Sequence, residues 1–586
     1  MATIPESHPT LCDVLVIGSG AAGLTAAITA ATAGLRVIVA EKASLVGGAT
    51  AWSGGWVWLP GTSEADRING SGDGNRAKTY LKQSIGSGFD NKRIDAFVEN
   101  SRQLDAFLKK HTSVRFLPDT SLPDYQSDLA GAATGGRSRV IAPYDGRKLG
   151  SDIHRLRAPL PVLTLAGLMP AAGLEMRHFF NATRSLASLM YVGKRLLQHV
   201  VEFWKVGRNL TLTNGNALAG GLFEAALNHD VQVLTNTAAQ SLTFEDGKVT
   251  GATLTTDSGV FPVRATHAVI LACGGFASHE PMRRQYYRHT SNGRGHWTLA
   301  PSETTGDGVQ LALAVGAQIT SYGDGNGAWV PVSLVPGTDG TERPFPHFAD
   351  RAKPGLFAVF ENGKRFTNEA APYFDFMQGL FKATPSLGEA TAWLICDHRF
   401  QRKYGLGFSK PSPFPLGRYL RTGYLKQAPT LGALAAACGI DRTAFCQTVA
   451  AYHENAANGK DPVFGRGQAA INRAQGDPTV TPNPCVAPVT KPPFYAVKIH
   501  PGCLGTFAGL KTDEQARVLG DNETPISGLF ACGSDMSSIM AGRYPAGGIS
   551  LGPALVFGNI AGRIAAKNPA KHSQDQEHPE QRWSLQ

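Results

Sequence analysis

The sequence predicts a mixed fold (α/β plus α+β), in which a nucleotide-binding α/β domain is built from two separated segments and a second domain is inserted between them. Three observations support this prediction. The 586-residue chain opens with a strand, a glycine-rich turn and a helix, its middle is rich in aromatic residues and prolines, and it closes with a glycine-rich turn and an apolar helix. Apolar residues make up 42% and charged residues 17%, against roughly 25% charged in an average protein, so a large core can be buried.

The first segment begins with a β-α-β unit. Residues 12–18 (CDVLVIG) are almost wholly apolar, as a buried parallel strand is, and an alanine-rich helix runs from the turn to about Ala33. A second strand, LRVIVAEK, ends near Glu41. The turn between them, residues 18–23 (GSGAAG), places glycines where backbone amides can approach a pyrophosphate at a helix N-terminus, while the acidic residue can bind a ribose. The unit therefore predicts a Rossmann-type dinucleotide site.

The remaining elements give the domain boundaries. Residues 75–112 have helical spacing, residues 231–237 form a strand, a hairpin surrounds Asp246-Gly247, and residues 267–275 form another apolar strand. The pattern changes at about residue 286 and strand-and-turn signals return after residue 492. We predict a first segment of the nucleotide-binding domain at 1–285, an inserted catalytic (substrate) domain at 286–492, a second nucleotide-binding segment at 493–570, and a disordered polar tail at 571–586.

Composition narrows the classes of partner. The formal charge of +10 indicates a basic, solvated surface, and no Lys/Arg run suggests a nucleic-acid site. Eight scattered cysteines without a CxxC pair argue against a metal site or a disulfide framework and favour a reducing, cytoplasmic compartment. No signal peptide and no uninterrupted apolar run of about 18 residues is visible, so no membrane span is predicted. Residues 160–191 are the most apolar stretch, and a peripheral membrane contact there is left open.

The cofactor is predicted to be FAD. The segment 47–55 (GGATAWSGG) resembles the flavin-contacting stretch of the fumarate reductase and ketosteroid dehydrogenase superfamily, and residues 273–276, 305–308 and 528–535 fit the same superfamily. No second GxGxxG indicates a nicotinamide cosubstrate. Residues 49–55 contain no histidine of the kind that carries a covalent flavin in relatives, so non-covalent FAD is expected. The predicted FAD contacts are Gly18, Ser19, Gly20, Ala22, Gly23, Glu41, Lys42, Gly48, Ala49, Thr50, Ser53, Gly54, Gly55, Gly274, Asp307, Gly533, Asp535, Ser550 and Leu551.

Three tyrosines stand in separate motifs. Tyr125 lies in PDYQSDL, Tyr373 follows the run NGKRFTNEAAP, and Tyr544 lies in RYPAGGISLGP. Together with the flavin segments, these motifs resemble those of the 3-ketosteroid Δ1-dehydrogenases over nearly the whole chain. The resemblance implies α,β-desaturation of a cyclic ketone by FAD. In that reaction Tyr544 and the backbone N–H of Gly548 bind the carbonyl oxygen, Tyr373 removes the α-proton with help from Tyr125, and N5 of FAD receives the β-hydride.

Two departures from the family pattern leave the substrate open. The turn reads Tyr-Pro-Ala-Gly-Gly rather than Tyr-Pro-Gly-Pro-Gly, and Arg543 replaces a small or polar residue. A cation there is either a surface residue or a partner for a substrate carboxylate, so a single-ring ketone such as cyclohexanone or 4-oxocyclohexanecarboxylate is an alternative to a steroid. The external electron acceptor, a quinone or another compound, has no sequence signal.

Two other functions compete with desaturation. A fumarate-reductase-like ene reductase ranks below it, because Tyr373 stands where those enzymes have an arginine proton donor and residues 505–509 (GTFAG) lack their histidine. A non-catalytic flavin-binding or electron-transfer protein is disfavoured by the three motif tyrosines. Arg365 and Glu369 are interpreted as a structural pair, and Asn368 as the cap of a turn.

Overall fold

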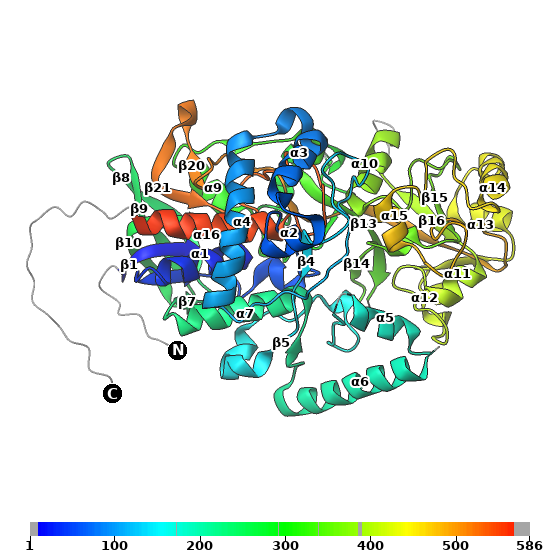
Figure 1. Ribbon diagram of the computed structural model, residues 1–586, viewed down its shortest axis with the longest axis horizontal. Helices are drawn as coiled ribbons and strands as arrows, with labels where there is room; N and C mark the ends of the chain where they lie inside the picture. Colours follow the sequence, from blue (N-terminus) through cyan, green and yellow to red (C-terminus); the bar gives the residue numbers. More distant parts are fainter. Residues whose placement is uncertain are drawn as a thin grey trace, which may run out of the picture.

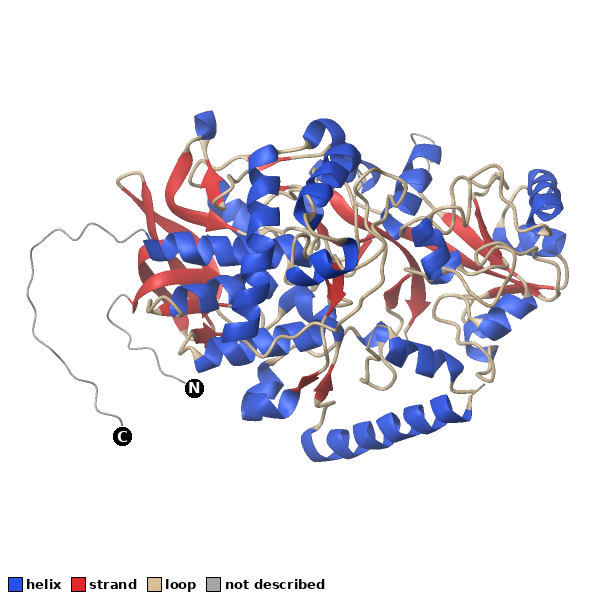
Figure 2. Cartoon of the chain, in the orientation of Figure 1, coloured by secondary structure: helices blue, strands red, loops and turns tan. Residues whose placement is uncertain are grey.

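The computed structural model describes residues 10–171, 173–183, 185–290, 292–337, 339–384 and 389–567. The polar tail predicted at 571–586 lies outside these residues. Figure 1 shows two sheet-containing regions side by side, one built mainly from the two ends of the chain and the other from its middle. Helices cover the first sheet, and loops connect short strands and helices in the second region (Figure 2).

The first sheet has the strand order β20-β21-β9-β10-β1-β2-β7, with β8 paired to β9. Its centre is parallel: β1 (Thr10–Ile17) lies between β10 (Gly259–Leu271) and β2 (Val37–Ala40), and β2 pairs with β7 (Gln232–Leu234). Strand β21 (Pro525–Ala531), from near the other end of the chain, joins β10 in parallel. Both ends of the chain therefore contribute to one nucleotide-binding sheet.

The predicted hairpin is confirmed. Strands β8 (Ala238–Glu245) and β9 (Lys248–Thr256) pair antiparallel, and the two residues between them, Asp246 and Gly247, both have positive φ. This is the backbone that a tight two-residue hairpin turn requires.

Helices α1 (Ala21–Ala31) and α16 (Leu551–Lys567) pack closely against each other over this sheet. A Cβ atom added at Gly558 would lie 2.5 Å from the carbonyl oxygen of Ala22, and one added at Gly562 would lie 2.5 Å from that of Ala26. The glycines of α16 are therefore the residues that let the first and last helices of the domain touch. Thr29 Oγ1 also accepts a hydrogen bond from Asn559 Nδ2 (3.0 Å).

The second sheet has the order β14-β13-β18-β16-β15, namely β14 (Glu342–Pro346), β13 (Gly327–Pro336), β18 (Phe494–Thr506), β16 (Ala392–Cys396) and β15 (Leu356–Val359). Strands β11 (Trp297–Thr298) and β17 (Lys426–Ala428) also pair with β18. Strand β18 begins two residues after the predicted boundary at residue 492, yet it pairs with strands of the inserted region rather than with the nucleotide-binding sheet. The residues of β18 do not indicate which sheet the strand joins. The domain limits stay a prediction.

The other elements connect these sheets or cover them. Among them, α6 lies along the lower edge of the molecule in Figure 1. None of the described helices is long and apolar enough to cross a membrane. The remaining helices and strands are β3 (Trp56–Trp58), α2 (Ser63–Asn69), α3 (Asp73–Ile85), α4 (Asn91–His111), β4 (Ser138–Val140), β5 (Tyr144–Asp145), α5 (Leu174–Asn181), α6 (Leu186–Val206), β6 (Thr211–Leu212), α7 (Asn214–Asn228), α8 (Glu280–Tyr286), α9 (Asp307–Leu313), β12 (Ile319–Thr320), α10 (Tyr373–Ala383), α11 (His398–Lys403), α12 (Gly417–Arg421), α13 (Leu431–Cys438), α14 (Arg442–Ala456), α15 (Ala470–Gln475), β19 (Gly509–Leu510) and β20 (Arg517–Leu519).

Candidate active site

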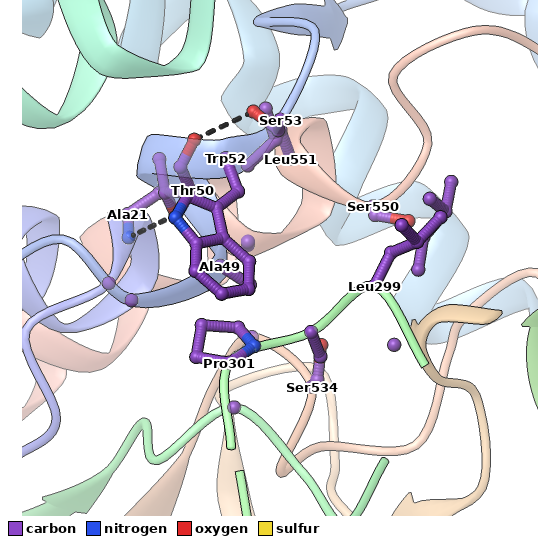
Figure 3. Close-up of a pocket in the computed structure, with 18 of the residues that line it drawn as sticks. Ala21, Ala49, Thr50, Trp52, Ser53, Leu299, Pro301, Ser534, Ser550 and Leu551 are labelled. Carbon is purple, nitrogen blue, oxygen red and sulfur yellow. Dashed lines mark hydrogen bonds between the residues drawn. The ribbon is translucent and has the colours of Figure 1, made fainter. Parts of the chain in front are cut away.

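A cavity of about 550 Å³ opens at the carboxyl ends of β1, β2 and β10 and extends to residues next to the second sheet. This is where parallel α/β sheets bind ligands, because the turns after the strands leave a crevice there. Figure 3 shows several of its lining residues, including Ala49, Thr50 and Ser550. Most of the predicted FAD contacts line it: Gly18, Ser19, Gly20, Ala22, Glu41, Lys42, Gly48, Ala49, Thr50, Ser53, Gly54, Gly55, Gly274, Asp307, Gly533, Ser550 and Leu551.

The glycine-rich turn after β1 has no room for side chains. Gly18 has φ +108°, and a Cβ atom there would lie 2.2 Å from the carbonyl oxygen of Ala272. The neighbouring Ser19 donates from its backbone N (2.9 Å) and its hydroxyl (2.5 Å) to Glu41 Oε2, which fixes this carboxylate at the end of β2. Thr50 Oγ1 accepts from the N–H of Ala21, the first residue of α1 (2.9 Å; Figure 3). Turn, acid and helix N-terminus therefore have the arrangement of a dinucleotide cradle.

Two cations line the same cavity. Lys42 Nζ is 2.5 Å from Asp307 Oδ2 and donates to Thr305 Oγ1 at the same distance. Arg157 Nη2 pairs with Glu303 Oε1 at 3.1 Å, while its buried Nε has no hydrogen-bond partner among the described residues. A buried donor is costly when it is unpaired, so a polar group of a bound ligand fits beside it. With the glycine cradle and this unpaired donor, the residues that line the cavity are suited to hold FAD.

Two of the predicted FAD contacts do not line the cavity. Gly23 packs inward, since a Cβ atom there would lie 2.0 Å from the carbonyl oxygen of Gly18. The buried carboxylate of Asp535 accepts from the backbone N–H groups of Cys273 (2.6 Å) and Gly275 (2.9 Å), so it holds the turn after β10. Burial raises its pKa to about 6. Gly23 and Asp535 therefore support the turns that line the cavity without lining it themselves. Sequence reasoning did not identify these other lining residues: Arg157, Leu299, Ala300, Pro301, Thr304 and Ser534.

The structure brings the three motif tyrosines together at one end of the cavity. The ring centroids of Tyr373 and Tyr544 are 5.1 Å apart, those of Tyr125 and Tyr544 5.8 Å, and those of Tyr125 and Tyr373 6.0 Å. The hydroxyls of Tyr125 and Tyr544 both act on the pKa of the Tyr373 hydroxyl. All three are buried, and Gly548 lines the cavity beside them. Residues separated by 419 positions along the chain (125 to 544) thus form one cluster.

Hydrogen bonds join the loop that carries Tyr125 to the turn that follows Tyr544. The N–H of Tyr125 donates to the carbonyl oxygen of Pro545 (2.7 Å), and the same oxygen accepts from the Tyr80 hydroxyl (2.5 Å). Ser138 Oγ donates to the carbonyl oxygen of Gly547 (2.8 Å). These contacts lock the loop that carries Tyr125 to the turn that follows Tyr544. Tyr80 stands in no motif, and Ser138 belongs to the run GGRS after Tyr125 but was not among the predicted site residues.

Burial raises the pKa of each of the three hydroxyls. The pKa of Tyr373 stands well above its usual range, and the neighbouring hydroxyls raise it further. For Tyr125, burial raises the pKa, while the interaction with the Tyr373 hydroxyl and the positive charge of Arg351 both lower it and offset part of that increase. A tyrosine base in this cluster is therefore protonated at neutral pH in the ligand-free protein.

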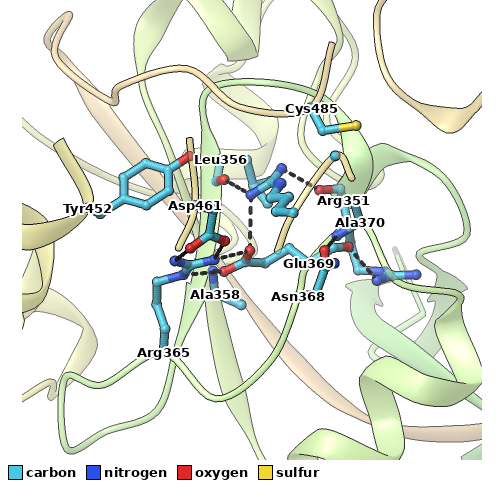
Figure 4. Close-up of polar contacts among 12 residues, drawn as sticks. Arg351, Leu356, Ala358, Arg365, Asn368, Glu369, Ala370, Tyr452, Asp461 and Cys485 are labelled. Atoms are coloured by element: carbon cyan, nitrogen blue, oxygen red, sulfur yellow. Dashed lines mark hydrogen bonds and ion pairs between the residues drawn. The ribbon is translucent and has the colours of Figure 1, made fainter. Parts of the chain in front are cut away.

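A buried network of charges lies behind the loop that leads to Tyr373 (Figure 4). Glu369 accepts from Arg365 Nε (2.8 Å) and Nη2 (2.7 Å), from Arg466 Nη1 (3.1 Å) and from the N–H of Ala358 (3.0 Å). Arg365 also pairs with Asp461 at 2.7 Å. The interpretation of Arg365 and Glu369 as a structural pair fits this geometry, and Arg466 and Asp461 complete it.

Two further contacts fix the same loop from its other side. Arg351 Nη1 donates to the carbonyl oxygens of Glu369 (2.8 Å) and Ala371 (3.2 Å). Asn368 Oδ1 accepts from the N–H of Ala370 (2.9 Å), which is the turn-capping contact expected of it. The backbone between residues 368 and 372 is therefore held on both sides just before Tyr373 begins α10.

Arg543 does not reach the cavity. Its side chain is exposed and does not line the tyrosine end, and its charge acts instead on Asp375, whose pKa burial raises to about 6. Several apolar side chains line the cavity, and the ring centroid of one of them, Phe348, lies 5.3 Å from that of Tyr373. The others include Leu122, Leu160, Leu163, Met169, Met176 and Leu504.

Comparisons with known proteins agree with this geometry. Residues 13–551 match the family model described as FAD binding domain. The chain is 38% identical to a 4-oxocyclohex-2-ene-1-carboxylate 5-dehydrogenase of Sinomonas cyclohexanicum (96% of this chain, 95% of the relative) and 34% identical to a 3-oxosteroid 1-dehydrogenase of Mycobacterium tuberculosis (95% and 99%). It superposes with a TM-score of 0.87 on the crystal structure of the 3-ketosteroid Δ1-dehydrogenase from Sterolibacterium denitrificans in complex with 1,4-androstadiene-3,17-dione, at 33% identity (95% of this chain, 100% of that one).

These matches confirm the predicted fold class, the predicted cofactor and the predicted resemblance. They cover nearly the whole chain and include both segments of the nucleotide-binding sheet as well as the inserted region. The chain belongs to the 3-ketosteroid Δ1-dehydrogenase-like family of FAD-dependent oxidoreductases.

Proposed function

We propose that this oxidoreductase introduces a double bond next to the carbonyl group of a cyclic ketone, in the manner of a 3-ketosteroid Δ1-dehydrogenase. The observation that carries the proposal is the cluster of Tyr125, Tyr373 and Tyr544 at the apolar end of a cavity whose other end fits a dinucleotide. Such a desaturation needs a donor for the carbonyl oxygen, a base for the α-proton and an acceptor for the β-hydride. When bound, FAD supplies the hydride acceptor.

The carbonyl oxygen would be bound by the Tyr544 hydroxyl and the backbone N–H of Gly548. Gly548 has φ +97°, and its carbonyl oxygen accepts from the N–H groups of Trp58 and Gly552, so its peptide is fixed by the backbone around it. Donors that are held in place before the reaction stabilise negative charge as it develops on an enolate oxygen, without a cost of reorganisation.

The α-proton would pass to Tyr373 as tyrosinate. A hydrogen bond donated by the Tyr125 hydroxyl would stabilise the tyrosinate once it has formed, and the positive charge of Arg351 lowers the pKa of Tyr125 in the same cluster. Because burial raises the pKa of Tyr373, the base form is scarce at neutral pH and becomes more abundant as the pH rises. The proposed base therefore favours turnover in alkaline solution.

The apolar lining favours a hydrophobic ring system, and we propose a 3-ketosteroid as the first candidate substrate. The Sinomonas relative supports a second candidate, a single-ring ketone of the cyclohexanone or 4-oxocyclohexanecarboxylate type. A carboxylate on the smaller ring would find no partner in Arg543, which lies outside the cavity, whereas Arg157 lines it. Absence of histidine from the described lining residues supports non-covalent FAD.

Anaerobic bleaching of the visible flavin band tests the proposal. The purified holoenzyme is mixed in turn with androst-4-ene-3,17-dione, cyclohexanone and 4-oxocyclohexanecarboxylate. Bleaching by the steroid supports the first candidate, and bleaching only by a single-ring ketone supports the second. If no cyclic ketone bleaches the flavin while fumarate reoxidises the reduced enzyme with turnover, the protein is an ene reductase and the proposal is wrong.

The site of action and the electron acceptor belong to the same proposal. All eight cysteines are free, as is typical of proteins from a reducing compartment, which supports a cytoplasmic location. We propose that an external acceptor, for which a quinone is the first compound to test, reoxidises the flavin after each turnover. Steady-state rates with a soluble quinone and with molecular oxygen as the alternative acceptor measure that preference.

A further inference from the structure

Helix α6 (Leu186–Val206) is built with its polar side inward. Three of its four buried residues are polar, the fourth being Val192, and each of the three makes a polar contact. Ser188 Oγ lies 3.1 Å from His178 Nδ1, Arg195 Nε is 2.7 Å from Glu175 Oε1, and His199 Nε2 is 2.8 Å from the carbonyl oxygen of Ala166. An ordinary surface helix buries an apolar stripe and exposes a polar one. In α6 these two faces are exchanged.

The outward face of α6 is apolar. At about 100° of rotation per residue, its members fall within an arc of about 120°, opposite the buried polar residues. Trp204 is 85% exposed and Leu186 73% exposed. We call this surface the α6 outer face, defined by Leu186, Leu189, Met190, Leu197, Val200, Val201 and Trp204, all exposed.

Single exposed apolar side chains are common on proteins, but a continuous patch of this kind marks an interaction site. No other described helix contributes more than one residue to the set of exposed large apolar side chains. Fixed contacts to α5 (Leu174–Asn181) and to the loop at Ala166 hold the helix in this orientation, so the exposed apolar face is part of the fold. Figure 1 shows that α6 lies at the edge of the molecule, where a flat surface can reach it.

Charges at the border of the α6 outer face favour an anionic partner. Lys194 and Lys205 are exposed and lie next to the apolar arc. The helix's single carboxylate, Glu202, is turned to the protein and accepts from the N–H of Leu210 (2.8 Å) and from Gln198 Nε2 (2.7 Å). Cations at the rim of an apolar stripe that carries an exposed tryptophan match the headgroup layer of a bilayer, where long basic side chains reach the phosphates.

We propose that the α6 outer face binds the surface of an anionic lipid bilayer, with the helix lying in the plane of the interface. The ion pair and hydrogen bonds on its inner side exclude a spanning orientation for α6. The contact also places lipid near the apolar end of the active-site cavity: Met176 of α5 lines that cavity, and a second cavity of about 230 Å³ beneath α6, lined by His199 and Phe203, shares Met169 with it.

The test is sedimentation of the FAD-loaded enzyme with vesicles of phosphatidylcholine mixed with phosphatidylglycerol, and with vesicles of phosphatidylcholine alone. We expect the wild-type protein to bind the anionic vesicles and to dissociate as salt is raised. The triple variant Leu189→Ser/Leu197→Ser/Trp204→Ser should lose at least about tenfold in partition coefficient, because it removes much of the inserted apolar surface. Lys194→Glu/Lys205→Glu should weaken binding by about fivefold or more per cation on anionic vesicles and much less on neutral ones.

A matched control removes exposed apolar residues elsewhere. Phe244→Ser/Val260→Ser/Val463→Ser changes three side chains that are 48%, 59% and 73% exposed and lie outside α6. This variant should sediment like the wild type. Flavin content and unfolding temperature, measured for every variant, separate a lost surface from a lost fold, and none of the substituted residues lines the active-site cavity.

Three outcomes would overturn the proposal. They are wild-type protein that stays in the supernatant, a triple variant that binds like the wild type, and a control that loses binding equally. A wild-type protein that does not bind vesicles, and whose mass by light scattering falls to that of a monomer in the triple variant, would instead identify the α6 outer face as a contact between copies of the chain. The vesicle assay does not depend on the ketone substrate, so it can fail or succeed independently of the proposed reaction.

Discussion

Replacing Glu369 by glutamine should both destabilise the fold and disturb the catalytic loop. Its side chain is fully buried and accepts four hydrogen bonds, three of them from the guanidinium groups of Arg365 and Arg466. Glutamine keeps the shape, removes the charge and turns one acceptor into a donor that faces these cations. Breaking a buried ion pair at one partner costs about 3–5 kcal/mol, and Asp461 compensates only Arg365, so we expect a loss of about that size.

Urea unfolding followed by tryptophan fluorescence measures this loss. The control is Glu280→Gln, which removes the carboxylate of an exposed pair with the same i,i+4 spacing, Arg284 Nη2 to Glu280 Oε1 at 2.5 Å. An exposed pair contributes less than about 1 kcal/mol. A loss below about 1 kcal/mol for Glu369→Gln, equal to that of the control, would refute the argument that this network supports the inserted domain.

Glu369→Gln should also lower kcat while FAD stays bound. The carbonyl oxygen of Glu369 accepts from Arg351, and the backbone continues through residue 372 into Tyr373, so a shifted carboxylate moves the proposed base. The pH dependence gives a second check. Although burial raises the pKa of Glu369, Arg365 and Arg466 hold it below its ordinary value. The network therefore stabilises the protein above the ordinary carboxyl pKa and loses that contribution as the pH falls through the lower value, and this acid-side loss should be absent in the variant.

Three other changes test the proposed reaction. Tyr544→Phe and Tyr373→Phe should each lower kcat by about 10²–10³-fold with unchanged flavin content, measured by steady-state turnover and absorbance, and near-wild-type rates in both would remove these residues from the mechanism. Because burial raises the pKa of Tyr373, log(kcat/KM) should climb with a slope of about one between about pH 7 and pH 10, and a flat profile in the wild type would mean that another group is the base. Gly548→Ala should abolish turnover, since a Cβ atom there would lie 2.7 Å from the backbone of Trp56 at φ +97°, whereas Gly247→Ala, also at positive φ but with nothing within 4 Å, should leave the rate unchanged; equal activity of the two variants would contradict this.

The nucleotide-binding half of the fold could be predicted because its signals are local. The apolar strand before Gly18, the turn and the strand before Glu41 lie within one short stretch, and the hairpin at Asp246-Gly247 depends only on the φ angles that those two residues accept. The tyrosine motifs could be identified in the sequence because each contains a run of residues that resembles a known family. Their convergence in space follows from the fold and could be expected only through that resemblance.

What the sequence could not show depends on contacts between distant residues. Arg351 and Arg466 stand in no motif, and their role appears only when burial brings them to the loop before Tyr373. Arg543 adjoins Tyr544 in the chain, so a cation in the site was a reasonable hypothesis, but in the fold its side chain is exposed and does not line the cavity. The apolar stretch noticed at 160–191 includes only the first residues of the α6 outer face, because the orientation of that helix depends on which side packs against α5.

The split origin of the first sheet sets an order for the synthesis of this protein. Strand β21 and helix α16 complete the sheet and cover α1, and both are synthesised after the strands of the second sheet. Until then, the cradle at Gly18 lacks the turn that contains Gly533 and the lining residues Gly548, Ser550 and Leu551. The complete cavity can therefore form only after the residues of the second sheet have been synthesised, and flavin binding to the complete cradle has to follow that point.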